Sequence, residues 1–274
     1  MIYNDKLQML NFEYLKNLNK EQKEAVSYLE GPLLIVAGAG SGKTKVLTSR
    51  IAHIIKSKKA YPNQILSVTF TNKASQEMQT RVSRMLEKEA IGLSWLGTFH
   101  SVSAKILRKH AGAVGLNSNF SIIDQDDQIR LIKNICKSEN IDIKKLAPNY
   151  ILSVINGWKN KGLYPEKVVP SKKNIFEKGI LKIYKIYQSK LLDLNTCDFG
   201  DLILHCVNIF ENNNDILEIY SNNFKYILVD EYQDTNFIQS KWLKFLAKKH
   251  KNICCVGDDD QSIYSWRGAE IRNF

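Results

Sequence analysis

The sequence predicts an α/β fold, in which a parallel sheet is flanked by helices and interrupted by an inserted all-helical subdomain. Short apolar runs alternate with stretches of helical periodicity early in the chain and again after residue 225, a pattern typical of parallel strands joined by crossover helices. From about Gly115 this strand rhythm fades, and apolar residues recur at helical spacing instead. We therefore expect residues 1–113 and 197–274 to form the α/β domain and residues 114–196 to form the helical subdomain.

Three strands are expected early in the chain, at 33–37 (LLIVA), 65–70 (ILSVTF) and 93–99 (LSWLGTF). Helices are expected after them, at 43–57, 72–89 and 100–110. The first of these helices is the best defined, because its apolar side chains recur on one face. They are Val46, Leu47, Ile51, Ile54 and Ile55.

Helices are also expected within the insertion, at 125–140, 148–162 and 173–194. Asp124 is the expected N-cap of the first one, because its side chain can accept a hydrogen bond from the helix backbone. That helix has an apolar face formed by Ile129, Ile132, Ile135 and Cys136. Strand and helix alternate again at 226–230, 238–250 and 252–258.

The chain is basic, with 39 Lys and Arg against 28 Asp and Glu and a net charge of +11. The insertion contributes 14 Lys and Arg against 8 Asp and Glu, and residues 157–190 alone hold nine lysines and two glutamates. Such an excess is typical of a nucleic-acid contact, but it is equally typical of helices whose lysines face solvent. Composition leaves both interpretations open.

Neither the cysteines nor the N-terminus indicates an exported protein. The five cysteines form no C-x-x-C pair, which favours buried thiols in a reducing cytosol over a zinc site. The N-terminus lacks a basic start followed by an apolar core, and no run reaches the ~18 apolar residues of a membrane helix. We expect a cytoplasmic protein without a signal peptide or a membrane partner.

A glycine-rich loop joins the first strand to the first helix in the segment LLIVAGAGSGKT (33–44). Glycines let such a loop turn its backbone N–H groups inward, and the helix N-terminus adds positive potential for phosphate. Lys43 is expected to reach the β- and γ-phosphates of ATP, and the Thr44 hydroxyl is expected to bind Mg²⁺. The expected phosphate-binding residues are Ala37, Gly38, Ala39, Gly40, Ser41, Gly42, Lys43 and Thr44, with Ala37 where glycine is usual.

Two adjacent acids follow the strand at 226–230 in the segment YILVDEYQDT. Asp230 lies at the carboxyl end of this strand, where ligands collect in open α/β sheets. We expect Asp230 to hold Mg²⁺ and Glu231 to orient and deprotonate the attacking water. The side chains of adjacent residues diverge, which suits two separate roles.

The segments A-x-x-G-S-G-K-T (37–44) and D-E-x-Q-D-T (230–235) resemble motifs of the UvrD/Rep/PcrA group of superfamily-1 helicases. Other segments resemble motifs of the same family in the expected order, from residue 18 to residue 269. They are LNKEQKEAV (18–26), VTFTNKAS (68–75), GTFHS (97–101) and GDDDQSIYSWRGA (257–269). The resemblance implies a RecA-like P-loop NTPase sheet with ATP and Mg²⁺ as cofactors.

The resemblance also assigns roles to individual residues. It implies that Gln22 hydrogen-bonds the adenine and that Gln261 senses the γ-phosphate, so that Gln261 acts in catalysis with Lys43 and Glu231. The residues that it implies for single-stranded DNA are Phe70, Asn72, His100, Tyr264, Trp266 and Arg267.

The DNA-binding role of the aromatic residues competes with burial in the core. Phe70, Tyr264 and Trp266 lie at or near the ends of expected strands, where a single ring usually packs inside. Proteins that bind single strands use such rings as stacking platforms, worth ~1–3 kcal/mol per base. The polar neighbours favour stacking, more firmly for Tyr264 and Trp266 than for Phe70. His100 could equally cap a helix.

Two features depart from the family. Lys45 stands where many relatives carry arginine, so a bidentate guanidinium contact with the nucleotide is not expected there. The second RecA-like domain, which supplies arginine fingers in this family, has no counterpart within residues 1–274.

The sequence thus predicts the ATP-binding N-terminal portion of a 3′–5′ DNA helicase and translocase for DNA repair or replication restart. The expected partners are single-stranded DNA, junctions of single- and double-stranded DNA, the second RecA-like domain and other repair or replication proteins, in a bacterial-type cytoplasm near the nucleoid. Residues 1–274 alone are expected to bind ATP and single-stranded DNA but to hydrolyse ATP poorly. Two alternatives stay open: a nucleotide-dependent single-strand-binding module without motor activity, and the motor part of a helicase–nuclease subunit.

Overall fold

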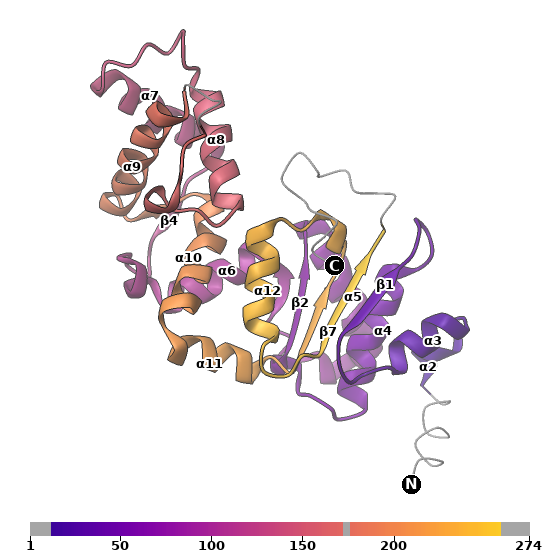
Figure 1. Cartoon of the computed structure of the whole chain (residues 1–274). Coiled ribbons are helices and arrows are strands. Elements are labelled where there is room, and N and C mark those ends of the chain that lie inside the picture. The colour runs from indigo at the N-terminus through magenta and orange to yellow at the C-terminus, as the bar shows by residue number, and fades with distance from the viewer. Residues whose placement is uncertain (1–11, 172–175, 259–274) are drawn as a thin grey trace. The chain divides into compact units, whose positions relative to one another are not determined.

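The structure is a computed structural model that describes residues 12–171 and 176–258 (Figure 1). Contacts divide the described residues into two units. The first holds residues 12–102, 218–234 and 246–258, and the second holds residues 103–171, 176–217 and 235–245. The domain boundaries expected from the sequence divide the chain differently and stay a prediction. Gln261, Tyr264, Trp266 and Arg267 lie outside the described residues.

The first unit contains a five-stranded sheet in which all neighbouring strands run parallel, which confirms the predicted α/β fold. Its strands are β1 (Leu33–Val36), β2 (Ile65–Thr69), β3 (Leu96–Thr98), β6 (Tyr226–Val229) and β7 (Ile253–Gly257). They lie in the order β1-β7-β6-β2-β3. Because parallel strands end at the same edge, the carboxyl ends of β1, β7 and β6 lie side by side (Figure 1).

Two helices of the first unit, α4 (Lys43–Lys56) and α5 (Asn72–Leu86), bury their apolar faces against this sheet. The helices α2 (Glu13–Lys16) and α3 (Lys20–Ser27) form a separate apolar cluster with Val46 of α4. Leu47, Ile51 and Ile54 of α4 are fully buried in a cluster with Leu228 of β6 and Val256 of β7. Full burial of one such side chain stabilises a fold by ~1.5–3 kcal/mol, so this face fixes the position of α4 under the sheet.

The second unit contains α7 (Gln125–Ser138), α8 (Pro148–Asn160), α9 (Glu177–Asp193) and α10 (Phe199–Asn212), with one short parallel pair formed by β4 (Ser121–Ile122) and β5 (Thr196–Cys197). The remaining helices, α6 (Phe99–Lys109), α11 (Asn214–Asn223) and α12 (Phe237–Ala247), each contain a point at which the chain changes units, and a further change lies between Asp234 and Thr235. Short 3₁₀ helices span Pro62–Gln64, Glu87–Ala90, Ala111–Val114, Pro165–Lys167 and Tyr232–Asp234. The expected N-cap of α7 is confirmed, because the Asp124 side chain accepts a hydrogen bond from the Asp127 backbone N–H.

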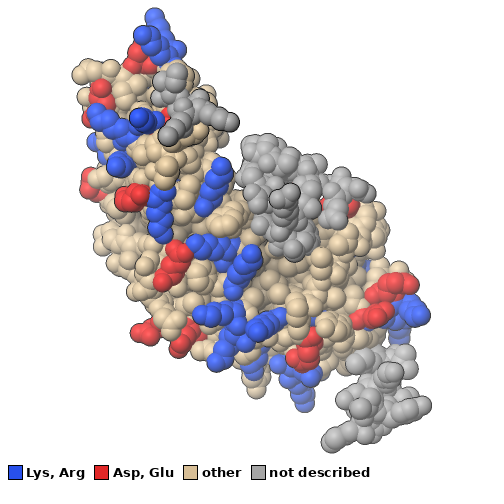
Figure 2. Space-filling model, viewed as in Figure 1, with Lys and Arg blue, Asp and Glu red and all other residues tan. Residues whose placement is uncertain are grey.

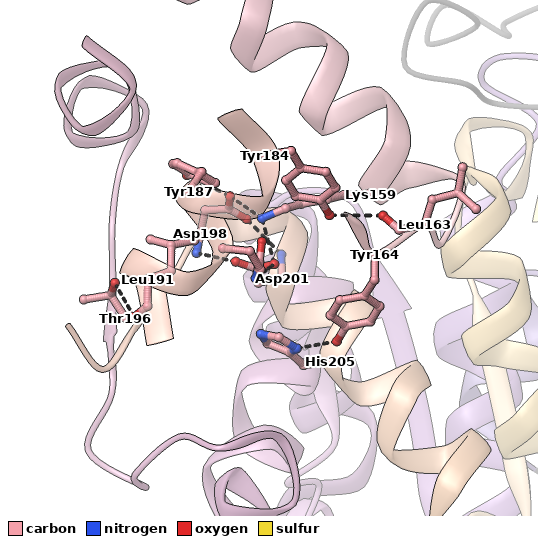
Figure 3. A network of polar contacts seen from close by, with 11 residues as sticks. Lys159, Leu163, Tyr164, Tyr184, Tyr187, Leu191, Thr196, Asp198, Asp201 and His205 are labelled. Atoms are coloured by element: carbon pink, nitrogen blue, oxygen red, sulfur yellow. Dashed lines mark hydrogen bonds and ion pairs between the residues drawn. The ribbon is translucent and has the colours of Figure 1, made fainter. Parts of the chain in front are cut away.

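A buried ionic cluster joins α8, α9 and α10 in the second unit (Figure 3). Lys159 Nζ lies 2.6 Å from Asp198 Oδ2 and 2.7 Å from Asp201 Oδ1, and Tyr187 of α9 donates a further hydrogen bond to Asp198. Although burial opposes it, the two carboxylates raise the pKa of Lys159, so its ammonium group stays charged inside the unit. Lys159 is only 1% exposed and therefore does not belong to the basic surface that the lysine count of 157–190 suggests.

Other expectations can be compared with the part of the chain that the structure describes. All five cysteines are buried and free, as expected. No helix within 12–171 or 176–258 is long and apolar enough to span a membrane.

Candidate active site

The loop after β1 has the backbone that a phosphate site needs. Gly40 and Gly42 have φ angles of 72° and 89°, which lie in the left-handed region that favours glycine. A Cβ atom on Gly42 would lie 2.9 Å from Gln22 Nε2, so a side chain at this position would displace the Gln22 amide. Loop residues 38–41 are exposed, and α4 begins directly after them at Lys43. The loop and the N-terminus of α4 can therefore present backbone N–H groups to one anion.

The Lys43 ammonium group lies beside the carboxyl ends of β1 and β7. Its Nζ donates to the carbonyl oxygen of Ala37 at 2.9 Å and lies 3.3 Å from Asp258 Oδ2. The Lys43 side chain is only 9% exposed, and that of Asp258, directly after β7, is similarly buried. Thr44 follows in the first turn of α4 and is half-buried. The charged end of Lys43 thus lies beside the loop that it is predicted to serve.

Gln22, the predicted adenine ligand, reaches the same loop from α3. It forms a capping box with Asn19, and its Nε2 donates to the carbonyl oxygen of Ser41 at 2.8 Å. These contacts hold the amide of Gln22 beside the loop. Contact with a base stays a prediction.

Asp230 and Glu231 follow β6, next to β7 in the sheet. Asp230 is 5% exposed, and its Oδ1 accepts a hydrogen bond from the Glu231 backbone N–H at 3.1 Å. Burial and the neighbouring Glu231 raise the pKa of Asp230 to about 6, while Lys43 acts in the opposite direction. Glu231 has a φ angle of 50°, an unusual conformation for a residue with a side chain. A buried carboxyl group of raised pKa near a lysine is typical of a functional site.

Two residues of this site, Gln233 and Asp258, were missed by the sequence analysis. Gln233 Nε2 donates to Glu231 Oε2 at 2.7 Å, and Gln233 Oε1 accepts from the Asp258 backbone N–H at 3.0 Å. Both residues lie inside motifs that were noted for their other residues. Gln233 is the Q of D-E-x-Q-D-T, and Asp258 is the first D of GDDDQ. The available signal was that Asp258 comes directly after β7 and that Gln233 lies in the turn that follows β6.

Three predicted DNA contacts follow β2 and β3 at the same edge of the sheet. Phe70 is half-buried, with its ring centroid 5.4 Å from that of buried Phe99. Asn72 is exposed at the first position of α5, and His100 is half-buried near the start of α6. Phe70 therefore packs against Phe99 while part of its side chain stays exposed, and stacking with a base stays a prediction. The remaining predicted contacts, Tyr264, Trp266 and Arg267, and the predicted sensor Gln261 lie outside the described residues.

Charged side chains of both signs are exposed on the face of the molecule that Figure 2 shows. On the face drawn in Figure 2, Lys and Arg side chains lie in several groups with Asp and Glu side chains among them. The choice between a nucleic-acid contact and solvated lysines therefore still depends on the site residues.

The comparisons with known proteins agree with the motifs and the fold. The sequence profile described as UvrD/REP helicase N-terminal domain matches residues 18–274. The chain belongs to the UvrD/REP helicase family. This membership confirms the resemblance stated above and accounts for the parallel sheet.

Individual relatives of this UvrD/REP chain are helicases by name. A probable DNA helicase II homolog of Rickettsia conorii is 51% identical over 97% of this chain and 41% of its own length. DNA helicase II of Rickettsia typhi is 50% identical over 98% of this chain and 41% of its own length. The ATP-dependent DNA helicase PcrA of Staphylococcus epidermidis is 49% identical over 94% of this chain and 35% of its own length. The chain thus spans less than half the length of these relatives.

The raised pKa of Asp230 predicts how its charge affects stability. The folded-state pKa of about 6 lies above the ordinary 3.8, so ionisation of Asp230 weakens the fold above pH 6, and this cost vanishes as the pH falls toward 4. Asp230→Asn should therefore raise the free energy of unfolding at pH 7.5 by roughly 1–3 kcal/mol, and by much less at pH 4.5. Urea unfolding at the two pH values measures both.

The matched control is Asp193→Asn, at an exposed aspartate at the end of α9. It should change the free energy of unfolding by less than about 0.5 kcal/mol at either pH. A stabilisation by Asp230→Asn that is equal at pH 7.5 and pH 4.5 would contradict the assigned cause.

Proposed function

We propose that this chain is the ATP-binding N-terminal portion of a 3′–5′ DNA helicase and translocase that acts in DNA repair or replication restart. The observation that carries the proposal is the meeting of Lys43, Asp230 and Glu231 at one edge of the sheet, beside a loop whose glycines permit close approach of phosphate. Family membership and the helicase names of the relatives support it.

The donor set of the site fits a magnesium ion that is shared with a nucleotide. The Thr44 hydroxyl and the Asp230 carboxylate are oxygen donors, and Mg²⁺ usually takes one or two protein oxygens together with phosphate and water oxygens. Among the described residues, no group of three or more His, Cys, Asp or Glu could hold a metal by itself. When bound, the ion would supply charge neutralisation at the phosphates.

The side chains divide the remaining chemistry. Lys43 neutralises charge on the β- and γ-phosphates of ATP, and Gln22 holds the adenine. Glu231 orients the attacking water and accepts its proton, and no covalent enzyme intermediate forms. Gln261 senses the γ-phosphate from the segment after β7.

Single-stranded DNA is the proposed second substrate. It would pass Phe70, Asn72 and His100 at the ends of β2 and β3. Tyr264, Trp266 and Arg267 would contact it from the segment after β7. The proposed partners are junctions of single- and double-stranded DNA, a second RecA-like domain and other repair or replication proteins. Because the proposed substrate is DNA, the proposed location is the nucleoid in the cytoplasm.

The experiment that tests this function titrates residues 1–274 into fluorescein-labelled oligo(dT) and, separately, into a fluorescent MgATP analogue. We expect binding to both ligands, competition by unlabelled ATP for the analogue, and slow hydrolysis without unwinding. Absence of MgATP binding would overturn the proposal. Absence of DNA binding by a chain that binds MgATP would overturn the assigned DNA path and leave the nucleotide site standing.

A further inference from the structure

We propose that Gln233 is the positioning residue of the general base. Its side-chain amide holds the Glu231 carboxylate at a fixed position relative to the end of β7. This inference rests on the proposed function, because it assumes that Glu231 activates water. Gln233 lies in the turn after β6 and is only 2% exposed, so its side-chain amide is available to its protein neighbours and not to solvent.

Both ends of the Gln233 amide are used, and each partner fixes which end faces it. The Glu231 carboxylate can only accept, and it takes a hydrogen bond from Gln233 Nε2 at 2.7 Å. The Asp258 backbone N–H can only donate, and it gives a hydrogen bond to Gln233 Oε1 at 3.0 Å. A single rigid amide therefore spans the ends of two neighbouring strands, β6 and β7.

The backbone hydrogen bonds of Glu231 fix its main chain but not its side chain, so another group must hold the carboxylate. The N–H of Glu231 donates to Asp230 Oδ1, and its carbonyl oxygen accepts from the Asp234 N–H at 3.0 Å. These bonds stabilise the left-handed φ angle of 50°, but they do not restrict the side-chain torsions that carry the carboxylate. The bond from Gln233 does, because it holds one oxygen of the Glu231 carboxylate at a fixed donor.

The other end of the amide connects the base to the phosphate loop. Asp258 lies 3.3 Å from Lys43, so the residue that orients Gln233 also contacts the predicted phosphate ligand. Movement of the β7 end would release Gln233 Oε1 and allow the base to turn away from the attacking water. Gln261, the predicted γ-phosphate sensor, is three residues further along the chain. The two hydrogen bonds of Gln233 can therefore align the Glu231 carboxylate only when the end of β7 and the glycine-rich loop are in position.

Two substitutions separate the two ends of the amide. Gln233→Glu keeps an acceptor for the Asp258 N–H but places a carboxylate beside Glu231. Gln233→Leu removes both bonds at similar volume. Both should slow hydrolysis of MgATP by at least tenfold in single-turnover measurements with excess protein. The Kd for a fluorescent MgATP analogue should change by less than threefold in both.

Two further readouts follow the two ends of the amide, and the first would not respond to a merely structural role. In Gln233→Glu, the acid limb of the single-turnover pH–rate profile should move up by about one pH unit, because two carboxylates side by side share a proton. Hydrogen exchange of the Asp258 amide should be at least tenfold faster in Gln233→Leu and unchanged in Gln233→Glu. The circular dichroism spectrum at 222 nm shows whether each variant is folded, and either one alone is sufficient for the hydrolysis test.

The matched control is Gln188→Leu, because Gln188 is also a buried glutamine whose Nε2 donates to a carboxylate, that of Asp201, in the second unit. It should leave single-turnover hydrolysis within threefold of wild type. Wild-type rates in the Gln233 variants, or an equal loss in Gln188→Leu, would overturn the positioning role while the proposed function stands. A wild-type chain that binds MgATP but never hydrolyses it would overturn both.

Discussion

Replacing Lys43 with alanine should abolish MgATP binding at concentrations where the wild-type chain is saturated. The Lys43 ammonium group lies at the start of α4, beside the glycine loop, with its side chain 9% exposed. Hydrogen bonds to charged groups contribute about 1.5–3 kcal/mol each, so two lost phosphate contacts correspond to a roughly 10²–10⁴-fold weaker Kd. Isothermal titration calorimetry with MgATP measures this change.

The control for this variant is Lys56→Ala, in the last turn of the same helix, where Lys56 pairs with Glu89 at the surface. Its MgATP affinity should match that of wild type. Because Lys43→Ala also leaves the buried Asp258 carboxylate without this cation, a thermal melt should accompany the titration. A folded Lys43→Ala protein with wild-type affinity would show that the glycine loop does not bind phosphate.

Replacing Glu231 with glutamine should stop hydrolysis and leave nucleotide binding intact. Glutamine has nearly the same shape but cannot accept the proton of the attacking water, and general-base catalysis contributes ~10²–10⁴ in rate. Single-turnover hydrolysis should fall by this factor, while the Kd for MgATP changes by less than threefold. This combination distinguishes Glu231 from Lys43, whose loss acts on binding.

An exposed glutamate is the suitable comparison for Glu231→Gln. Glu77 lies on the surface of α5, where it pairs with Arg81. Glu77→Gln should hydrolyse ATP at the wild-type rate. If Glu231→Gln also hydrolyses ATP within threefold of wild type, then another group activates the water and the mechanism proposed for this edge is incorrect.

The parts of the fold that were predictable carry a local signal. The apolar stripe of α4 repeats at helical spacing, and every strand of the sheet except β3 is a short, mainly apolar run. Asp124 could be identified as a cap because capping depends on neighbouring backbone groups. The positions of Lys43 and Asp230 also follow locally, since Lys43 begins the helix after the glycine loop of β1 and Asp230 comes directly after β6.

The helix α10 was not predicted because its apolar residues cluster in a short run. Its residues 201–207 are all buried, and a short apolar run of this kind does not distinguish a buried helix from a strand. The pair formed by β4 and β5 was missed for a different reason. Each strand has two residues, too few for any periodicity.

Contacts between residues far apart in the sequence were beyond local signals. Lys159 reads as one more surface lysine, and only the packing of α8 against α10 places it between Asp198 and Asp201. The bond from the Asp258 N–H to Gln233 joins residues 25 positions apart. Such contacts depend on which strands are neighbours in the sheet. The sequence of a single strand does not determine its neighbours.

The most direct test of the central claim is steady-state ATP turnover with and without single-stranded DNA. It should be measured for residues 1–274 alone and for this chain fused to the C-terminal part of DNA helicase II from Rickettsia typhi, a relative 50% identical over 98% of the chain. We expect slow turnover by the chain alone and at least a 100-fold rise in DNA-stimulated turnover in the fusion, since an arginine finger contributes ~10³–10⁵. Rapid DNA-stimulated turnover by residues 1–274 alone, or a folded fusion that DNA does not stimulate, would contradict the account.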